Sequence, residues 1–179
     1  MSARRWLALG GAAALASCAT LWLPVPLLHV PPVAIGPPRT LEQRLQIVRH
    51  GQSVVMDGVA DVSATRVQLI ATALGVRLYD LAYDGRRVAP GVTGTPPGGL
   101  PPVAAIDDFL LLYAPAEVLA AALPRGFRLV PGPAGRQLFR GERLLVAVTY
   151  DGPDPANGRS HLHNAALDYD LTVDSTVVP

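Results

Sequence analysis

From Leu41 onward, apolar and polar residues mostly alternate, and this period of two constrains the fold more than any other feature of the chain. The clearest run follows Gly51, and its residues of one parity are all small or apolar: Val54, Met56, Gly58, Ala60 and Val62. Asp57 and Asp61 fall on the other parity. Because neighbouring side chains on a strand point to opposite faces, the pattern predicts antiparallel strands with one buried face.

Turn signals divide this pattern into about five strands before residue 93. Leu74-Gly75 precedes the fourth expected strand, at residues 76–83. Asp84-Gly85 is a strong hairpin signal, since glycine tolerates a positive φ. Residues 86–92 would form the return strand, and the proline- and glycine-rich residues 93–102 would form a loop.

The period changes in the middle of the chain. Residues 103–113 carry apolar side chains at helical spacing, and residues 114–123 predict a second short helix with Pro115 in its first turn. Strands are then expected at residues 127–130, 137–139, 143–150 and 161–178. The order predicts an α+β fold, a curved antiparallel sheet of about nine to eleven strands with two short helices over its concave face.

A sheet of this size can enclose a small ligand, although alternation does not tell whether the interior is filled or hollow. We expect a hydrophobic cavity inside the sheet. The residues assigned to its lining are apolar and moderate in size: Ile47, Met56, Val67, Leu69, Phe109, Leu110, Val146 and Leu171.

The amino terminus has the pattern of a secretory signal. Arg4 and Arg5 precede an uncharged stretch from Trp6 to Ala16, and small residues lead to Cys18. The run Leu15-Ala16-Ser17-Cys18 resembles the bacterial lipobox, in which the thiol is alkylated by diacylglycerol before cleavage. The pattern therefore predicts a signal peptide at residues 1–17 and lipid attachment at Cys18. A membrane-spanning helix is disfavoured because prolines interrupt the apolar stretch after the signal.

Residues 18–40 are rich in proline, which favours an extended, semi-rigid spacer that lifts the domain off the membrane. The same segment also carries large apolar residues, including Trp22 and Leu28. Part of it would therefore either lie on the bilayer or fold back onto the domain. The resulting division is a signal at 1–17, a tether at 18–40 and one folded domain at 41–178.

No residue pattern predicts catalysis, a metal site or a cofactor. His161 and His163 would share one face of a strand with Asp168 or Asp170 nearby, but no third ligand has a diagnostic spacing, so a surface pair is the better interpretation. Asp107-Asp108 lie about 100° apart on the expected helix, which favours a solvated helix face over acid-base chemistry.

Charge and cysteine content exclude several other classes of protein. The formal net charge is +1, and removal of Arg4 and Arg5 with the signal would lower it to −1 (+1 − 2 = −1). No basic stripe remains to bind a phosphate backbone, so nucleic acid is not an expected partner. With one cysteine the chain has no internal disulfide and no paired-cysteine metal site.

The lipobox, the tether, the Leu74-Gly75 turn, the helical segment and the closing hairpins together resemble LolB, the outer-membrane lipoprotein that receives other lipoproteins from a periplasmic carrier. The likeness covers about residues 41–178. It implies an unclosed half-barrel with a helical lid over an apolar cavity for acyl chains, and a LolA-like carrier as partner. In LolB a protruding Asn-Pro-Leu-Gly turn carries the leucine that enters the membrane. Thr72-Ala73-Leu74-Gly75 matches it at Leu74 and Gly75 only.

The chain looks closer still to uncharacterised lipoproteins found in gene clusters for aryl polyene pigments. The matching stretches are residues 74–78, Tyr83-Asp84-Gly85 and residues 107–111. Ala19, where an aspartate would retain a lipoprotein at the inner membrane, implies the periplasmic face of the outer membrane as the location.

Three functions remain open from the sequence. The first is an outer-membrane lipoprotein that binds or transfers an acylated or polyene-lipid ligand. The second is a structural or assembly lipoprotein that docks a protein partner in an envelope export complex. The third, an enzyme accessory or weak hydrolase, depends only on His161, His163 and the nearby aspartates, so we expect no enzymatic activity.

Overall fold

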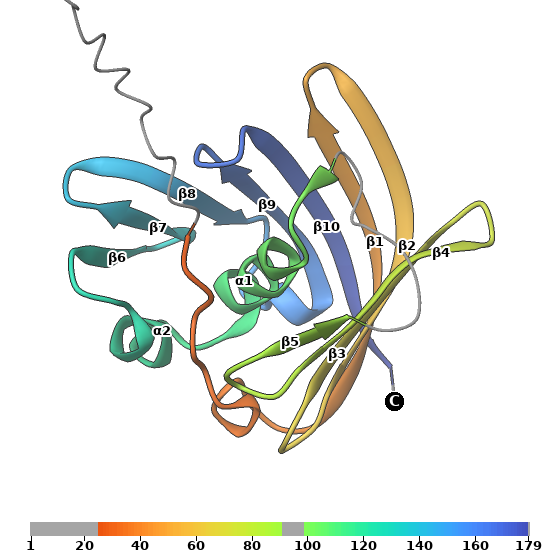
Figure 1. Ribbon diagram of the computed structural model, residues 1–179, viewed down its shortest axis with the longest axis horizontal. Coiled ribbons are helices and arrows are strands. Elements are labelled where there is room, and N and C mark those ends of the chain that lie inside the picture. The colour runs from red at the N-terminus through yellow and green to blue at the C-terminus, as the bar shows by residue number, and fades with distance from the viewer. Residues whose placement is uncertain (1–24, 91–98, 179) are drawn as a thin grey trace, which may run out of the picture.

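The computed structural model describes residues 25–90 and 99–178, and its main element is a single ten-stranded antiparallel sheet (Figure 1). The strands follow the order β5-β4-β3-β2-β1-β10-β9-β8-β7-β6, so β5 and β6 are its two edges and the sheet does not close. The bounds are β1 (Arg39–Arg49), β2 (Gln52–Val62), β3 (Val67–Ala73), β4 (Val76–Tyr83), β5 (Val88–Pro90), β6 (Phe127–Gly132), β7 (Gly135–Arg140), β8 (Arg143–Tyr150), β9 (Gly158–Asn164) and β10 (Tyr169–Val178). The predicted half-barrel is confirmed.

The centre of the sheet joins segments that are far apart in the chain. β1 pairs with β10 along its length, with Leu45 opposite Val173, and every other pair of neighbouring strands is consecutive in sequence. Each half of the sheet is thus a meander of hairpins, and the β1–β10 pair connects the two meanders.

The predicted alternation is confirmed on the strands where it was clearest. On β2, Met56, Ala60 and Val62 are buried while Val55 and Val59 are exposed. On β3, the residues that were expected to share a face, Val67, Leu69 and Ala71, are all buried. The period of two therefore identified the concave face correctly.

Helix α1 (Pro102–Tyr113) lies within the curve of the sheet, and α2 (Ala116–Ala122) follows it beside β6 (Figure 1). Proline at its start gives α1 a preorganised first turn, and Pro115 separates the two helices because a residue before proline avoids the helical region. Pro115 is the N-cap of α2 rather than part of its first turn. Short 3-10 turns, η1 (Pro32–Ala34) and η3 (Pro155–Asn157), complete the elements.

The prediction of a solvated helix face at Asp107-Asp108 is wrong. Both side chains are buried, with exposures of 3% and 5%. Every residue from Ile106 to Tyr113 is buried, because the concave sheet covers one side of α1 and an N-terminal segment contacts another. Helical periodicity indicates one apolar face and gives no sign that a polar face is covered as well.

The N-terminal segment at residues 25–35, here called the strap, packs on the domain instead of extending from it. Leu28, Val30 and Ile35 are buried in the core. Figure 1 shows the strap crossing the open side of the half-barrel. Of the two alternatives left open for the apolar part of the tether at 18–40, the described residues follow the second and fold back onto the domain, and β1 begins at Arg39 rather than after residue 40.

The return strand expected at residues 86–92 is β5, which is only three residues long, and residues 91–98 lie outside the described part. Within the described ranges no helix has the length and apolar character needed to cross a membrane.

Candidate functional site

The candidate site is a cavity of about 40 Å³ between α1 and the concave face of the sheet. Its wall comes from β1, β2, β3, β4 and β10 on one side and from α1 on the other. Four of the eight predicted lining residues do line it: Ile47, Leu69, Phe109 and Leu171. The prediction was therefore correct for residues of β1, β3, β10 and α1, and it included no residue of β4.

The other four predicted lining residues are core residues outside this cavity. Met56, Val67 and Leu110 are almost completely buried and do not line it. Val146 lines a smaller cavity of about 10 Å³ next to Val25 of the strap. Alternation separates the concave face from the convex face, but it does not separate lining residues from packed ones.

The cavity is smaller than an acyl chain requires. A volume of about 40 Å³ has room for about three water molecules, whereas sites for small organic ligands measure about 300–1,000 Å³. Phe109 and Leu112 of α1 project into the space that such a ligand would need. In this structure the space between α1 and the sheet is therefore too small to hold an acyl chain.

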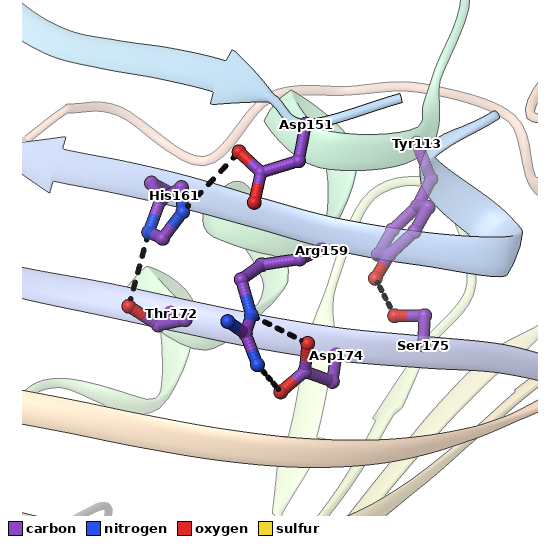
Figure 2. A network of polar contacts seen from close by, with 7 residues as sticks. All are labelled: Tyr113, Asp151, Arg159, His161, Thr172, Asp174 and Ser175. Carbon is purple, nitrogen blue, oxygen red and sulfur yellow. Dashed lines mark hydrogen bonds and ion pairs between the residues drawn. The ribbon is translucent and has the colours of Figure 1, made fainter. Parts of the chain in front are cut away.

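One part of the lining is polar. Gln43 Nε2 donates a hydrogen bond of 2.8 Å to the hydroxyl of Tyr113, and that hydroxyl lies 2.6 Å from Ser175 Oγ (Figure 2). Burial raises the pKa of Tyr113, so its hydroxyl stays protonated. These contacts hold the C-terminal end of α1 against β1 and β10.

A second polar group, which we call the polar corner, consists of Asp108, Tyr79 and Tyr169. The Tyr169 hydroxyl donates a short hydrogen bond to Asp108 Oδ2, and Asn164 Nδ2 donates one of 3.1 Å to the same hydroxyl. Desolvation raises the pKa of Asp108 to about 7, against the lowering effect of hydrogen bonding by the Tyr169 and Asn164 side chains. Desolvation and the nearby Asp108 together raise the pKa of Tyr79 to about 12. Asp108 Oδ1 is buried and has no hydrogen-bond partner among the described residues.

Asp107 faces the strap. Its Oδ1 accepts a hydrogen bond of 2.9 Å from the backbone N–H of Leu28. Desolvation raises the pKa of Asp107 to about 8, and the neighbouring Asp108 raises it further while the Leu28 N–H lowers it. The two adjacent aspartates thus have different partners, because Asp107 contacts the strap and Asp108 contacts the cavity wall.

The hairpin between β3 and β4 projects from the body of the sheet (Figure 1). Leu74 at its tip is fully exposed and has a φ of 51°, and Gly75 follows with a φ of 77°. Positive φ at both central residues is the geometry of a tight hairpin turn, which glycine adopts freely and leucine does not. Val76 adds a second exposed apolar side chain beside Leu74.

His161 and His163 lie on the convex face and are half-exposed. His161 contacts Asp151 at 3.5 Å and Thr172 at 3.2 Å, as Figure 2 shows, and His163 contacts Asp170 at 2.7 Å. In the described part of the chain no three His, Cys, Asp or Glu side chains are grouped as a metal site would need. Cys18, the predicted lipid attachment residue, lies outside the described residues.

Sequence reasoning missed the polar corner. Tyr79 and Tyr169 fall on the inward parity of their strands, and this parity was a signal that two hydroxyls enter an otherwise apolar interior. Asp108 gave no such signal, because its burial depends on how α1 is covered by other segments.

These features define a class of protein: an unclosed antiparallel half-barrel that holds a helix against its concave face. The chain belongs to a family described as proteins of unknown function, DUF3261, whose model matches residues 40–177. None of the curated proteins is significantly similar to it. Solved structures that are similar include that of a LolA superfamily protein from Nitrosomonas europaea, with 10% sequence identity and a TM-score of 0.42 over 78% of this chain and 84% of that chain.

Proposed function

We propose that this protein is a lipid-anchored protein at the periplasmic face of the outer membrane, and that it binds a hydrophobic ligand and transfers it at the membrane surface. The ligand would be an acylated molecule or a polyene lipid held between α1 and the sheet. The observation that carries the proposal is Leu74, a fully exposed leucine with a positive φ at the tip of a projecting hairpin.

When the hairpin tip is in water, both the backbone conformation and the exposed side chain of Leu74 are unfavourable. The left-handed conformation costs a residue with a Cβ about 1–2 kcal/mol. An exposed leucine also gains nothing from burial, whereas transfer of its side chain to an apolar phase contributes about 1.5–3 kcal/mol. Both costs are offset when the tip contacts the apolar part of a bilayer, and the adjacent exposed Val76 would enlarge that contact.

The second part of the proposal, the binding of a hydrophobic ligand, is supported by the cavity between α1 and the sheet. Its lining is largely apolar, and it lies under a helix whose side chains could be replaced by the apolar chain of a ligand. In this proposal α1 acts as a lid: the ligand displaces Phe109 and Leu112 from the sheet and takes over their contacts. A LolA-like carrier would deliver the ligand, and Cys18 would keep the domain at the membrane.

The test uses the full chain with Cys18→Ser, which removes the proposed lipid attachment site, and the methyl ester of cis-parinaric acid as a fluorescent polyene probe. Binding is measured by fluorescence, and transfer is measured as loss of bound probe to vesicles of phosphatidylethanolamine and phosphatidylglycerol. Leu74→Glu should leave the affinity unchanged and reduce the transfer rate at least about tenfold, because a carboxylate is costly to bury in a bilayer.

Val33→Glu is the matched control, because Val33 is also an exposed apolar residue but belongs to η1. It should transfer the probe like the parent protein. Equal loss of binding and transfer in Leu74→Glu would indicate misfolding and contradict the role of the tip. A parent protein that binds no probe, together with cross-linking to a protein partner in the envelope, would favour the alternative of an assembly lipoprotein.

A further inference from the structure

The polar corner contains a buried acceptor whose hydrogen-bonding capacity is only half used. Asp108 Oδ2 accepts from the Tyr169 hydroxyl, whereas Oδ1 has no partner among the described residues. A buried carboxylate oxygen without a donor is unfavourable, because it has lost its hydrogen bonds to water. Asp108 is one of the residues that line the cavity, so a ligand that displaces α1 could bring a donor to this atom and stabilise it.

The rest of the cavity wall indicates which donor fits. Among its described lining residues there is no Arg, Lys or His to neutralise an anionic head group, and Asp107 is adjacent to Asp108 in the helix. When Asp107 and Asp108 are ionised, a free fatty acid would bring a further carboxylate next to them, which is unfavourable. The remaining lining is mainly apolar, with Ile47, Leu69 and Leu171 among its members.

We propose that the ligand is an uncharged lipid with a hydrogen-bond donor, a hydroxyl or an amide N–H, and that the ionised Asp108 side chain accepts the hydrogen bond from this group at Oδ1. The inference rests on the proposed function, because it concerns a ligand in the same cavity, and it names the chemical class of that ligand. The apolar chain takes the place of Phe109 against the sheet, and Asp108 fixes the polar end. Tyr169 holds the Asp108 carboxylate in position through Oδ2.

The first test compares decanol with methyl nonyl ether, two isomers of the same atomic composition. Only decanol donates a hydrogen bond, while both have an apolar chain and an oxygen acceptor. Each isomer is used to displace the methyl ester of cis-parinaric acid from the full chain carrying Cys18→Ser, at about pH 9, where both aspartates are ionised.

Decanol should displace the probe at a concentration about tenfold lower than the ether, as a hydrogen bond to a charged acceptor predicts. In an apolar cavity without a free acceptor the opposite order is expected, because the hydroxyl loses its hydrogen bonds to water. Equal displacement, or stronger displacement by the ether, would therefore overturn the inference and indicate that a water molecule satisfies Oδ1.

The second test is Asp108→Asn, which reverses the polarity at the site. The amide oxygen would take the place of Oδ2 as acceptor for Tyr169, and the amide nitrogen would then occupy the position of Oδ1 as a donor. We expect the ether, which can accept but not donate, to become the better of the two competitors. An unchanged preference for decanol in a variant with a native circular dichroism spectrum would contradict the assignment to Asp108.

Asp107→Asn is the matched control. It makes the same chemical change one residue away, but Asp107 accepts from the Leu28 N–H and does not line this cavity. This variant should keep the preference for decanol. If the probe does not bind to the parent protein at all, the proposed function fails; if the probe binds and the isomers do not differ, only the inference about Asp108 fails.

Discussion

The hydroxyl of Tyr83, on β4, donates a hydrogen bond of 2.5 Å to the carbonyl oxygen of Leu28, on the strap. The same hydroxyl accepts a hydrogen bond of 2.8 Å from the N–H of Val30, and all three residues are completely buried. The strap is thus held by β4 on one side and by Asp107 of α1 on the other.

Tyr83→Phe should therefore loosen the strap. The change removes both hydrogen bonds of the hydroxyl and leaves the Val30 N–H with only its bond of 3.2 Å to the Leu28 carbonyl oxygen, so we expect the free energy of unfolding to fall by about 1–3 kcal/mol. Urea denaturation measures the loss, and faster hydrogen exchange at the Val30 amide would localise it. Tyr79→Phe, which removes a hydroxyl at the cavity instead, should leave exchange at Val30 unchanged. Native exchange at Val30 in Tyr83→Phe would contradict the role given to this hydroxyl.

In Phe109→Ala we expect the stability to fall while the affinity for a ligand rises. Phe109 is buried and lines the cavity, so its truncation should cost about 3–5 kcal/mol of stability and enlarge the space open to a ligand. The affinity for the methyl ester of cis-parinaric acid should rise. Leu110→Ala is the control, because Leu110 is buried outside the cavity: it should lose about 2–5 kcal/mol with no gain in affinity. A similar gain in both variants would indicate general loosening of α1.

Leu74→Asn should stabilise the protein while it impairs transfer. Asparagine adopts a positive φ more readily than leucine, so we expect a gain of about 1 kcal/mol in the free energy of unfolding. Transfer of the probe to vesicles should slow, because the tip loses its apolar side chain. Gly75→Ala at the neighbouring positive φ should instead destabilise the protein. A loss of stability in Leu74→Asn would show that Leu74 makes a favourable contact in the free protein.

Stability should fall as the pH rises from about 4 to about 8, in contrast to most proteins. Burial raises the pKa of Asp107 to about 8 and that of Asp108 to about 7. A carboxyl whose pKa is higher in the folded state binds more protons when folded, so its stabilising effect is complete below the unfolded pKa and is lost as the pH passes the folded pKa. The phenols that face the pair, Tyr79 and Tyr169, do not ionise in this range because their own pKa values are raised.

The measurement is the midpoint of urea denaturation at about pH 5 and about pH 8, which should be lower at the higher pH. In the double variant Asp107→Asn and Asp108→Asn the difference should largely disappear, since neither amide titrates. A midpoint that rises with pH in the parent protein would mean that the two carboxyls are not kept protonated by the fold.

The sheet was predictable from the sequence because each strand carries its own signal. Met56, Ala60 and Val62 repeat at a spacing that only a strand with one buried face explains. The burial of Asp107 and Asp108 was not predictable in this way. It depends on Leu28 and Tyr169, which lie 79 and 61 residues away from the aspartates that they contact. Long-range contacts of this kind determine which side chains meet at the cavity, and no local period encodes them.

For a related reason, the sequence left open whether the strap lies on the bilayer or packs on the domain. Proline disfavours helices and central strands, so a proline-rich segment suggests a spacer when it is considered alone. In the structure its backbone N–H groups at Leu28 and Val30 are bonded to side chains of other elements instead of to a neighbouring strand. A segment without secondary structure can therefore belong to the core when the rest of the fold supplies its hydrogen bonds.

The pairing of β1 with β10 has a consequence for how the chain acquires its structure. β1 and β10 are neighbours at the centre of the sheet, and each of the two meanders ends at this pair of strands. A chain that becomes available from its N-terminal end can form its first hairpins early, but β1 cannot pair with β10 until that last strand is present. A chain arrested before that point would leave β1 with an unpaired edge, so the folding of this domain is completed by β10.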